Sequence, residues 1–434
     1  MKTELTRRIE SKEAVIGIIG MGYVGLPLAL RFSEAGFRVL GFDVDPAKAE
    51  SIANRQSYFA HITDARISAA VDCGLTVTTD MARSAECDAI IICVPTPLGS
   101  HQEPDLSFIT GTMESLINHL RPGQVICLES TTYPGTTDEE IVPRAEQAGL
   151  NVGEDVFVVY SPEREDPGNQ TFHTQTIPKV VGGVTPVCLE VGEVLYGQVI
   201  DEVVSVSSTR AAEMTKLLEN IHRAVNIGLV NELKMVTDKM GIDIFEVINA
   251  AASKPFGFTP YYPGPGLGGH CIPIDPFYLT WKAKEYGVHT RFIELAGEVN
   301  TAMPQWVISK IEQALNDRCK AVNGSRILII GVAYKKDTND TRESPGLEIY
   351  ASLEKRGAIV SYHDPFVSVL PVTRQHALSG TSILLNSAII ASQDCVLICT
   401  DHSDIEYEVI RDSARLIIDT RGVFDADGTT IVLA

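Results

Sequence analysis

The chain has 434 residues, of which 44% are hydrophobic and 21% charged, as is typical of a soluble globular enzyme. One hydrophobic core rarely organises so many residues, so we expect two or three domains. The formal net charge of −20 argues against binding to nucleic acid or to an anionic membrane. An anionic small molecule needs only a local basic pocket, and the candidate residues are Lys335, Lys336, Arg342 and Arg421.

The sequence contains no membrane or secretion signal. No segment approaches 18 consecutive apolar residues, and the charged N-terminal segment lacks the apolar core of a secretory signal. The nine cysteines form no close CxxC pair, and several lie in apolar, strand-like segments, namely Cys93, Cys127, Cys395 and Cys399. We therefore expect a cytoplasmic protein with buried, reduced thiols. No metal site is predicted, because the ten histidines do not cluster with the cysteines at ligand spacing.

The first element is an apolar segment, residues 14–19, which is typical of a buried parallel strand. It leads into Gly20-Met21-Gly22-Tyr23-Val24-Gly25 and then into a helix that Gly36 ends. A second strand, residues 37–42, ends at Asp43. The order and length of these segments predict a βαβ unit with a GxGxxG loop between its strand and its helix.

This loop has the features of a dinucleotide-binding site. Gly20 permits the tight turn, Gly22 lets the backbone approach a pyrophosphate, and Gly25 lets helix and strand pack closely. Asp43 is placed to accept hydrogen bonds from the adenosine ribose, and its charge repels a 2′-phosphate, so NAD is favoured over NADP. The alternative is a glycine-rich turn that serves only packing, with Asp43 as an ordinary loop carboxylate.

Three further strands are predicted in the N-terminal half. Residues 89–94 end at Pro95-Thr96-Pro97, residues 125–128 end at Glu129-Ser130-Thr131, and residues 156–160 end at Ser161-Pro162-Glu163. Ligands of open α/β sheets bind at such strand ends, so Glu163 is a candidate general base and Arg164 a candidate phosphate or sugar ligand. A solvated charged turn fits the same spacing equally well.

The middle of the chain predicts one long helix, from about Ser207 to Met240, which Gly241 ends. At 1.5 Å per residue it extends about 45–50 Å, long enough to contact both domains and a second subunit. Lys216 and Asn220 are four residues apart and share a face, with Arg223 next along it. Lys216 near a thiol would lower the pKa of that thiol, but Glu213 and Lys216 also fit an ordinary surface ion pair.

A loop rich in proline and glycine follows. Six of the eight residues 263–270 are proline or glycine, and Cys271 comes next. Such a loop can fold closely around a ligand and expose the thiol, whereas structural cysteines are more usual in apolar segments. Asp275, four residues beyond Cys271, is a candidate to share its pocket.

The C-terminal third repeats the pattern of the first. Strands are predicted at 326–330, 358–362 and 394–400, and the segment 357–364 parallels 36–43 in ending on aspartate. We therefore predict an α/β fold of two doubly wound Rossmann-like domains joined by the long helix, the second without the glycine fingerprint. The predicted domains are residues 1–206, 207–305 and 306–434.

Taken together, these motifs resemble the UDP-glucose/GDP-mannose dehydrogenase family over nearly the whole chain. The motifs are GMGYVGLP, Pro95-Thr96-Pro97, Ser161-Pro162-Glu163-Arg164, Lys216 with Asn220, and GGHCIPIDP. Within that family, YSPEREDPGN (160–169) and KPFGFTPYYPGPGLGGHC (254–271) are most similar to bacterial UDP-N-acetylglucosamine 6-dehydrogenases of surface polysaccharide pathways, such as lipopolysaccharide and capsule synthesis.

The resemblance implies oxidation of the sugar C6 alcohol to a carboxylate with two NAD. Cys271 would form a thiohemiacetal and then a thioester, which water hydrolyses. Lys216 would stabilise the oxyanion, Asn220 and Asp275 would hold the water, and Glu163 would be the base. The matching cofactor positions are Gly20, Gly22, Tyr23, Val24, Gly25, Asp43, Thr96, Thr131 and Arg342. The matching substrate positions are Arg164, Lys216, Asn220, Arg223, Gly268 and Lys335.

The resemblance also implies that the C-terminal domain holds the UDP moiety and that the central helix forms a homodimer. UDP-glucose and UDP-N-acetylgalactosamine are alternative substrates. For an acetamido sugar, Phe256, Phe258, Tyr261 and Tyr262 are candidates for the wall of its pocket, although they also fit a hydrophobic plug under the loop. A two-electron hydroxy-acid dehydrogenase would have no use for a glycine-cradled cysteine, and a catalytically silent NAD-binding partner would not need Cys271 or Lys216.

Overall fold

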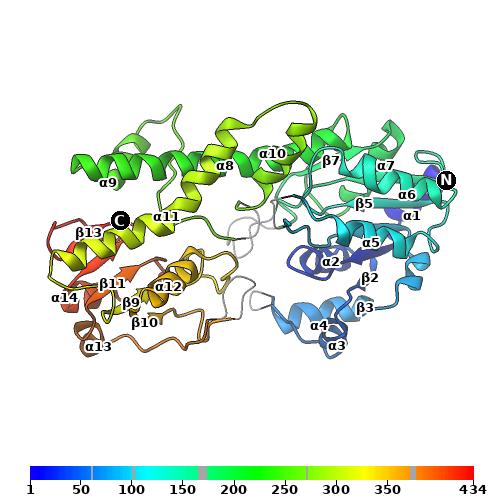
Figure 1. Cartoon of the computed structure of the whole chain (residues 1–434). Helices are drawn as coiled ribbons and strands as arrows, with labels where there is room; N and C mark the ends of the chain where they lie inside the picture. The colour runs from blue at the N-terminus through cyan, green and yellow to red at the C-terminus, as the bar shows by residue number, and fades with distance from the viewer. Residues whose placement is uncertain (60–61, 100–102, 165–173, 270–271, 372–377) are drawn as a thin grey trace. The chain divides into compact units, whose positions relative to one another are not determined.

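The computed structural model describes residues 1–59, 62–99, 103–164, 174–269, 272–371 and 378–434 (Figure 1). These residues divide into two compact units. Unit 1 comprises residues 1–219 with 281–288, and unit 2 comprises residues 220–280 with 289–434.

Unit 1 is built on an eight-stranded sheet in the order β3-β2-β1-β4-β5-β6-β7-β8. All neighbouring strands are parallel except β6 and β7. The first six follow the doubly wound order 3-2-1-4-5-6, in which ligands bind where the order reverses, between β1 and β4. The strands are β1 (Val15–Ile19), β2 (Arg38–Phe42), β3 (Thr76–Thr78), β4 (Ala89–Ile92), β5 (Gln124–Leu128), β6 (Val156–Tyr160), β7 (Lys179–Gly183) and β8 (Val203–Val206).

Helices cover both faces of this sheet, which is why β1, β5 and β6 are buried at every residue. One face packs on α1 (Lys2–Glu10), α2 (Gly25–Glu34), α4 (Asp64–Asp72) and α7 (Pro186–Tyr196). The other packs on α5 (Ser107–Leu116), η2 (Thr137–Ile141) and α6 (Val142–Gln147). Two further helices are α3 (Pro46–Ala53) and η1 (Met81–Glu86).

The long helix α8 (Thr209–Met240) confirms the helix predicted from about Ser207 to Met240. Its 32 residues extend about 48 Å at 1.5 Å per residue, and it contributes residues to both units. Gly241 ends it with a φ of +69°, the left-handed conformation common after helix C-termini. The helices that follow are α9 (Ile244–Ala252), α10 (Asp275–Glu285) and α11 (Arg291–Asn316).

Unit 2 contains a second, five-stranded parallel sheet in the order β10-β9-β11-β12-β13. This is the other common doubly wound order, 2-1-3-4-5. Its strands are β9 (Arg326–Ile330), β10 (Ile359–His363), β11 (Cys395–Ile398), β12 (Ile417–Asp419) and β13 (Ile431–Leu433). One face packs on α11 and α12 (Pro345–Lys355), the other on α13 (Ser387–Ala391) and α14 (Tyr407–Ser413).

The predicted fold class is confirmed, and every predicted strand is present within two residues at each end. The segment 89–94, predicted as the third strand, is the fourth, because the short strand β3 precedes it. Five strands, β3, β7, β8, β12 and β13, were not predicted. No described helix is long and apolar enough to cross a membrane.

The cysteines at 127, 395 and 399 are buried free thiols, as predicted, and Cys93 is half-buried. Cys73 and Cys319 are exposed, whereas Cys87 and Cys188 are also buried, so the apolar segments identified three of the five buried thiols among the described residues.

Candidate functional site

The glycine loop after β1 has the geometry that a dinucleotide site requires. Gly20 adopts a φ of +92°, in the left-handed region that favours glycine. A Cβ on Gly25 would lie 1.9 Å from the carbonyl oxygen of Gly20, so helix and strand pack too closely for any side chain. A Cβ on Gly22 would meet no atom within 4 Å. The open space at Gly22 fits a pyrophosphate approaching the backbone at the start of α2.

Asp43 stands at the end of β2, where the sequence predicts a ribose ligand. Its Oδ2 accepts hydrogen bonds from the backbone N–H of Met21 at 2.9 Å and from Nζ of Lys48 at 2.7 Å. Its Oδ1 accepts one from the N–H of Asp45 at 3.0 Å. Asp43 therefore holds the glycine loop in place, whatever further contact it makes to a cofactor. It is not the ordinary loop carboxylate of the alternative interpretation.

The parallel strands β4, β5 and β6 end at the same edge of the sheet and bring their predicted residues together. Thr96, after β4, is buried and donates a hydrogen bond from Oγ1 to the carbonyl of Thr131, after β5, at 2.7 Å. Tyr23, in the glycine loop, is 38% exposed and packs against Phe59. Val24 is the residue that precedes α2.

Glu163 and Lys216 meet, although they are 53 residues apart. Lys216, on α8, donates a hydrogen bond from Nζ to the backbone carbonyl of Glu163 at 2.5 Å. The Glu163 carboxylate faces the buried Lys179, whose Nζ lies 3.4 Å from its Oε2. Glu163 is therefore not part of a solvated charged turn.

Arg164 is fixed by protein groups. It pairs with Glu219 of α8 at 2.7 Å and donates to the carbonyl of Pro178 at 2.6 Å. These contacts orient its guanidinium at the end of β6.

The predicted surface pair of Glu213 and Lys216 is wrong. Glu213 is fully buried and accepts hydrogen bonds from the N–H of Gly135 and from the N–H and hydroxyl of Thr137. Burial raises the pKa of Glu213 to about 7, against the lowering effect of these hydrogen bonds. Glu213 thus anchors the segment that follows Thr131, a role that spacing on one helix does not reveal.

In unit 2, Asn220 and Asp275 meet across 55 residues. Asn220 Nδ2 donates to Asp275 Oδ2 at 2.5 Å, and both side chains are buried. Asp275 is the first residue of α10. The candidate nucleophile Cys271 lies outside the described residues, as does His270, so the structure gives the surroundings of the loop but not the thiol.

The glycines of the loop before Cys271 are required by packing on the protein itself. A Cβ on Gly268 would lie 2.4 Å from Cβ of Tyr334, and one on Gly266 would lie 3.0 Å from Cβ of Pro345. Gly269 has a φ of +84°, and its N–H donates to the carbonyl of Arg342 at 2.9 Å. The loop thus packs closely against the segment 334–345, which contains the predicted ligands Lys335 and Arg342.

The remaining predicted ligands of unit 2 are Arg342, Lys335 and Arg223. Arg342 donates from Nε to both carboxylate oxygens of Asp340 at 3.0 and 3.1 Å, and Lys335 is half-buried. Arg223 is exposed on α8.

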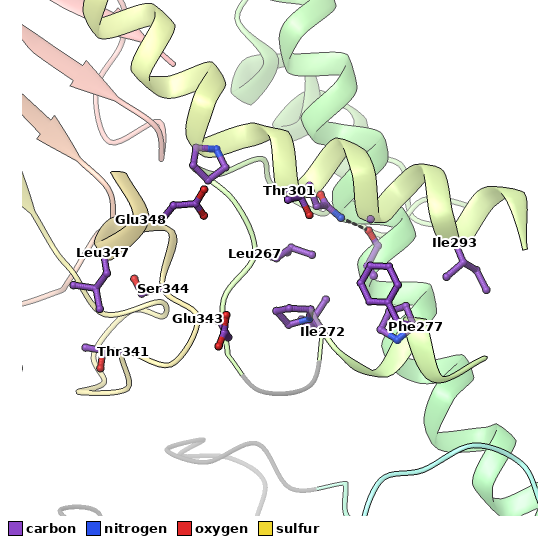
Figure 2. Close-up of a pocket in the computed structure, with 16 residues that line it drawn as sticks. Leu267, Ile272, Phe277, Ile293, Thr301, Thr341, Glu343, Ser344, Leu347 and Glu348 are labelled. Atoms are coloured by element: carbon purple, nitrogen blue, oxygen red, sulfur yellow. Dashed lines mark hydrogen bonds between the residues drawn. The ribbon is translucent and has the colours of Figure 1, made fainter. Parts of the chain in front are cut away.

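A cavity of about 390 Å³ lies behind the loop. Figure 2 shows Leu267 and Ile272 of the loop with Phe277 and Ile293 on the side of α10 and α11, and Glu343 on the opposite side. Residues on both sides of Cys271 therefore line this cavity, so there is open space next to the loop. None of the four predicted pocket aromatics is among its lining residues.

Those aromatics do not form a plug under the loop either. Phe256 is 71% exposed, Phe258 40% and Tyr262 48%, and Tyr261 hydrogen bonds to His222 on α8.

Among the described residues, no three His, Cys, Asp or Glu side chains are grouped so that they could hold a metal ion.

Three family models match the chain in succession. They describe the NAD-binding domain (residues 14–200), the central domain (210–302) and the UDP-binding domain (328–426) of the UDP-glucose/GDP-mannose dehydrogenase family.

Full-length relatives match as well. The chain is 33% identical to the UDP-N-acetyl-D-glucosamine 6-dehydrogenase of Pseudomonas aeruginosa, over 91% of this chain and 92% of that protein. It is 32% identical to the NDP-N-acetyl-D-galactosaminuronic acid dehydrogenase of Ralstonia nicotianae, over 97% and 99%. The solved structure of the UDP-D-ManNAc dehydrogenase from Pyrococcus horikoshii covers 96% of this chain and 98% of its own, with a TM-score of 0.87 and 29% identity. The relatives thus carry three different acetamido-sugar names.

Proposed function

The chain belongs to the UDP-glucose/GDP-mannose dehydrogenase family and is an NAD-dependent nucleotide-sugar dehydrogenase, and we propose that it oxidises UDP-N-acetylglucosamine at C6 to the uronate. The observation that carries the four-electron chemistry is the buried hydrogen bond between Asn220 and Asp275. Asp275 lies four residues after Cys271 in the chain. A hydroxyl oxidised only to the aldehyde needs neither a nucleophile nor polar groups held for a water molecule.

The proposed chemistry assigns one task to each residue. NAD, when bound, accepts the hydride that leaves C6 in each of two oxidations. Cys271 thiolate adds to the C6 aldehyde to give a thiohemiacetal, which loses the second hydride and becomes a thioester. Lys216 stabilises the oxyanion, Asn220 and Asp275 hold the water, and Glu163 accepts its proton as the thioester is hydrolysed.

The ligand assignments follow the same proposal. Tyr23, Val24, Thr96, Thr131 and Arg342 contact NAD, whereas Arg164, Arg223, Gly268 and Lys335 contact the UDP-sugar. The open space at Gly22 supports the first assignment, and the match of residues 328–426 to the UDP-binding domain supports the second.

The direct test counts NADH released per UDP-sugar consumed. Two NADH and a uronate support the proposal, one NADH indicates a two-electron dehydrogenase, and none indicates a silent NAD-binding protein. Cys271→Ala is expected to abolish uronate formation and leave NAD binding intact, because no thiohemiacetal can form. Near-normal uronate production by this variant would rule out the covalent mechanism.

The choice of substrate is tested by kcat/KM for UDP-N-acetylglucosamine, UDP-N-acetylgalactosamine and UDP-glucose measured side by side. We expect the first to be oxidised fastest. A site that pairs the acetamido group leaves polar atoms unsatisfied with UDP-glucose, and such discrimination reaches about 10⁴-fold. A preference for the galacto epimer or for UDP-glucose would overturn the assignment and leave the four-electron mechanism standing. The product is an acidic sugar donor, which fits cytoplasmic synthesis of surface polysaccharide precursors.

We further propose a homodimer formed through α8. Leu229, Leu233, Val236 and Met240 recur at intervals of four, three and four residues, so they share one helix face, and they are 41–64% exposed. A face of this kind is typical of helices that pack on a partner. Light scattering at micromolar concentration is expected to give a dimer or a larger assembly. Leu233→Glu is expected to weaken it, whereas Lys239→Glu, about a quarter turn away, is expected not to; a wild-type monomer would contradict the proposal.

A further inference from the structure

A buried set of charges lies at the ends of β5 and β6 in unit 1. Lys179, the first residue of β7, is 4% exposed, and its Nζ lies 2.8 Å from Oε2 of Glu129 and 3.4 Å from Oε2 of Glu163. Glu129, directly after β5, is 2% exposed, and its other oxygen accepts a hydrogen bond from the hydroxyl of Tyr196. Lys179, Glu129 and Tyr196 have no task in the chemistry described so far.

The electrostatics keep Lys179 charged. Burial opposes the charged form of Lys179, but the carboxylates of Glu129 and Glu163 outweigh burial and raise its pKa. Burial raises the pKa of Tyr196 as well, so its hydroxyl remains a neutral donor to Glu129. Burial raises the pKa of Glu129, against the lowering effect of Lys179. The ammonium group of Lys179 therefore stands between the carboxyl groups of Glu129 and Glu163, and Glu163 is the candidate base.

A purely structural ion pair does not explain this arrangement. Desolvating two charges costs several kcal/mol each, and well-packed apolar side chains of similar volume are often as stable. A structural pair also needs only Lys179 and Glu129. The additional contact reaches Glu163 at the sheet edge where ligands bind, and the Glu163 backbone is held by Lys216. Carboxylate and backbone of Glu163 are thus fixed from two sides.

We propose that Lys179 is a positioning residue, which together with Glu129 holds the Glu163 carboxylate where it accepts a proton from the hydrolytic water; this rests on the proposed function. In that step the water oxygen bonds to the thioester carbon, the C–S bond breaks and its electron pair leaves with the sulfur of Cys271. The water proton passes to Glu163. A general base acts only from a defined hydrogen-bonding position, so a carboxylate free to rotate slows this step alone.

The test uses the full-length protein with NAD and UDP-N-acetylglucosamine. Lys179→Met removes the ammonium, and the double variant Lys179→Met/Glu129→Gln removes both buried charges while keeping similar volume, so it is expected to fold even if the single variant does not. In both, kcat is expected to fall about tenfold to a hundredfold, part of the roughly 10²–10⁴-fold effect of a general base. Two NADH are released in a burst, and the thioester accumulates as a covalent adduct seen by intact-protein mass spectrometry. Lys179→Arg restores part of the rate.

Lys282 offers a matched control. It is another buried lysine of unit 1, paired with Glu139 at 2.9 Å and with Glu285 at 2.8 Å. Lys282→Met is expected to lower stability without accumulation of the thioester.

The possible results distinguish the positioning role of Lys179 from the proposed function. A folded double variant that hydrolyses the thioester at the wild-type rate, or that loses kcat without a covalent adduct, overturns the positioning role. Release of only one NADH per substrate by the wild type overturns the proposed function, and the positioning role with it.

Discussion

Each of the two sheets has an aspartate directly after its second strand, and the two aspartates have different surroundings. In unit 1, Asp43 follows the second strand of the sheet and accepts a hydrogen bond from the N–H of Met21, just after β1. In unit 2, Asp364 follows β10 and accepts hydrogen bonds from the N–H of Val332 and Ala333, just after β9. The parallel that the sequence indicates between 36–43 and 357–364 is therefore present in three dimensions.

The surroundings of the two aspartates differ. Asp364 is 2% exposed, and its remaining bonding capacity goes to the N–H of Phe366 and Val367 and to Nε2 of His402. The N–H of Asp337 donates to Nδ1 of His402, so Nε2 carries the proton that is donated to Asp364.

The residues that follow β1 and β9 differ at one position. The glycine directly after each strand is crowded in both units: a Cβ on Gly20 would lie 2.6 Å from the carbonyl oxygen of Cys93, and a Cβ on Gly331 would lie 2.5 Å from Cβ of Thr400. Two residues further on, Gly22 leaves open space in unit 1, whereas the corresponding residue of unit 2, Ala333, carries a side chain and is buried. The first loop therefore leaves room for a ligand at a position that protein fills in the second.

The largest expected effect is on unit 2. Asp364→Ala removes the acceptor of four backbone N–H groups and of His402, which leaves buried donors unsatisfied. Breaking such a buried network costs about 3–5 kcal/mol in the free energy of unfolding. NAD affinity, measured at a temperature where the variant is folded, is expected to stay near the wild-type value. A loss of NAD affinity comparable to that of an Asp43 variant would break the distinction between the two aspartates.

Asp43→Ala is expected to have the next largest effect, on the cofactor. Hydrogen bonds to a charged group contribute about 1.5–3 kcal/mol, so NAD affinity is expected to fall about tenfold to a hundredfold. The preference for NAD over NADP narrows because the charge that repels a 2′-phosphate is lost. Asp45→Ala is the control: it removes the cap of α3, where Asp45 accepts from Ala47 N–H, and affects stability only. An unchanged cofactor preference in Asp43→Ala would show that this carboxylate does not face the ribose.

A buried lysine of unit 2, Lys234, is expected to make the stability of the protein depend on pH. It is buried in unit 2, its Nζ has no hydrogen-bond partner among the described residues, and burial lowers its pKa from 10.5 to about 7. Between these values the unfolded chain binds a proton that the folded chain does not, so stability falls as the pH drops from about 10.5 to 7. The slope is at most roughly 1.4 kcal/mol per pH unit. Lys234→Met is expected to remove this dependence in urea unfolding, and an identical slope in the variant would contradict it.

Glu213, on the unit 1 part of the same helix, is expected to act in the opposite direction. Its pKa is raised to about 7 from 4.5, so the folded chain holds a proton in this window that the unfolded chain has lost. Stability therefore falls as the pH rises from about 4.5 to 7. The effect is smaller than that of Lys234, because the window is narrower and the hydrogen bonds from Gly135 and Thr137 still stabilise the charged form. Glu213→Gln flattens the curve in this window; a steeper fall in the variant would refute the assignment.

Continuous apolar segments made most of the fold predictable. Strands such as β6 and β9 match their predicted limits at every residue, because strands covered on both faces are apolar throughout. β3 has three residues, none of them buried, and β7 begins with a buried lysine and ends with two glycines, so neither gives that signal.

The candidate site was predictable where a motif follows a strand and unpredictable where distant segments meet. Thr96 and Thr131 were predicted through the family resemblance, and they meet because the ends of parallel strands share an edge. Lys179 lies 16 residues from Glu163 and 50 from Glu129, and no local spacing connects these residues. The signal available in the sequence was that Lys179, a charged residue, begins an otherwise uncharged segment, residues 179–183. Glu213 was assigned to the helix surface because helical spacing says nothing about what covers that face.

The packing of Gly268 and Gly269 on Tyr334 limits how this loop can diverge among descendants of the gene. Position 269 must remain glycine because of its φ of +84°, whereas position 268 is restricted by the side chain opposite it. The nearest atom is Cβ of Tyr334, which every residue except glycine carries, so a side chain at 268 requires glycine at 334 in the same molecule, and neither replacement is favourable alone. In a library randomised at both positions, we expect the surviving variants to change as pairs, so the two sites evolve as one unit.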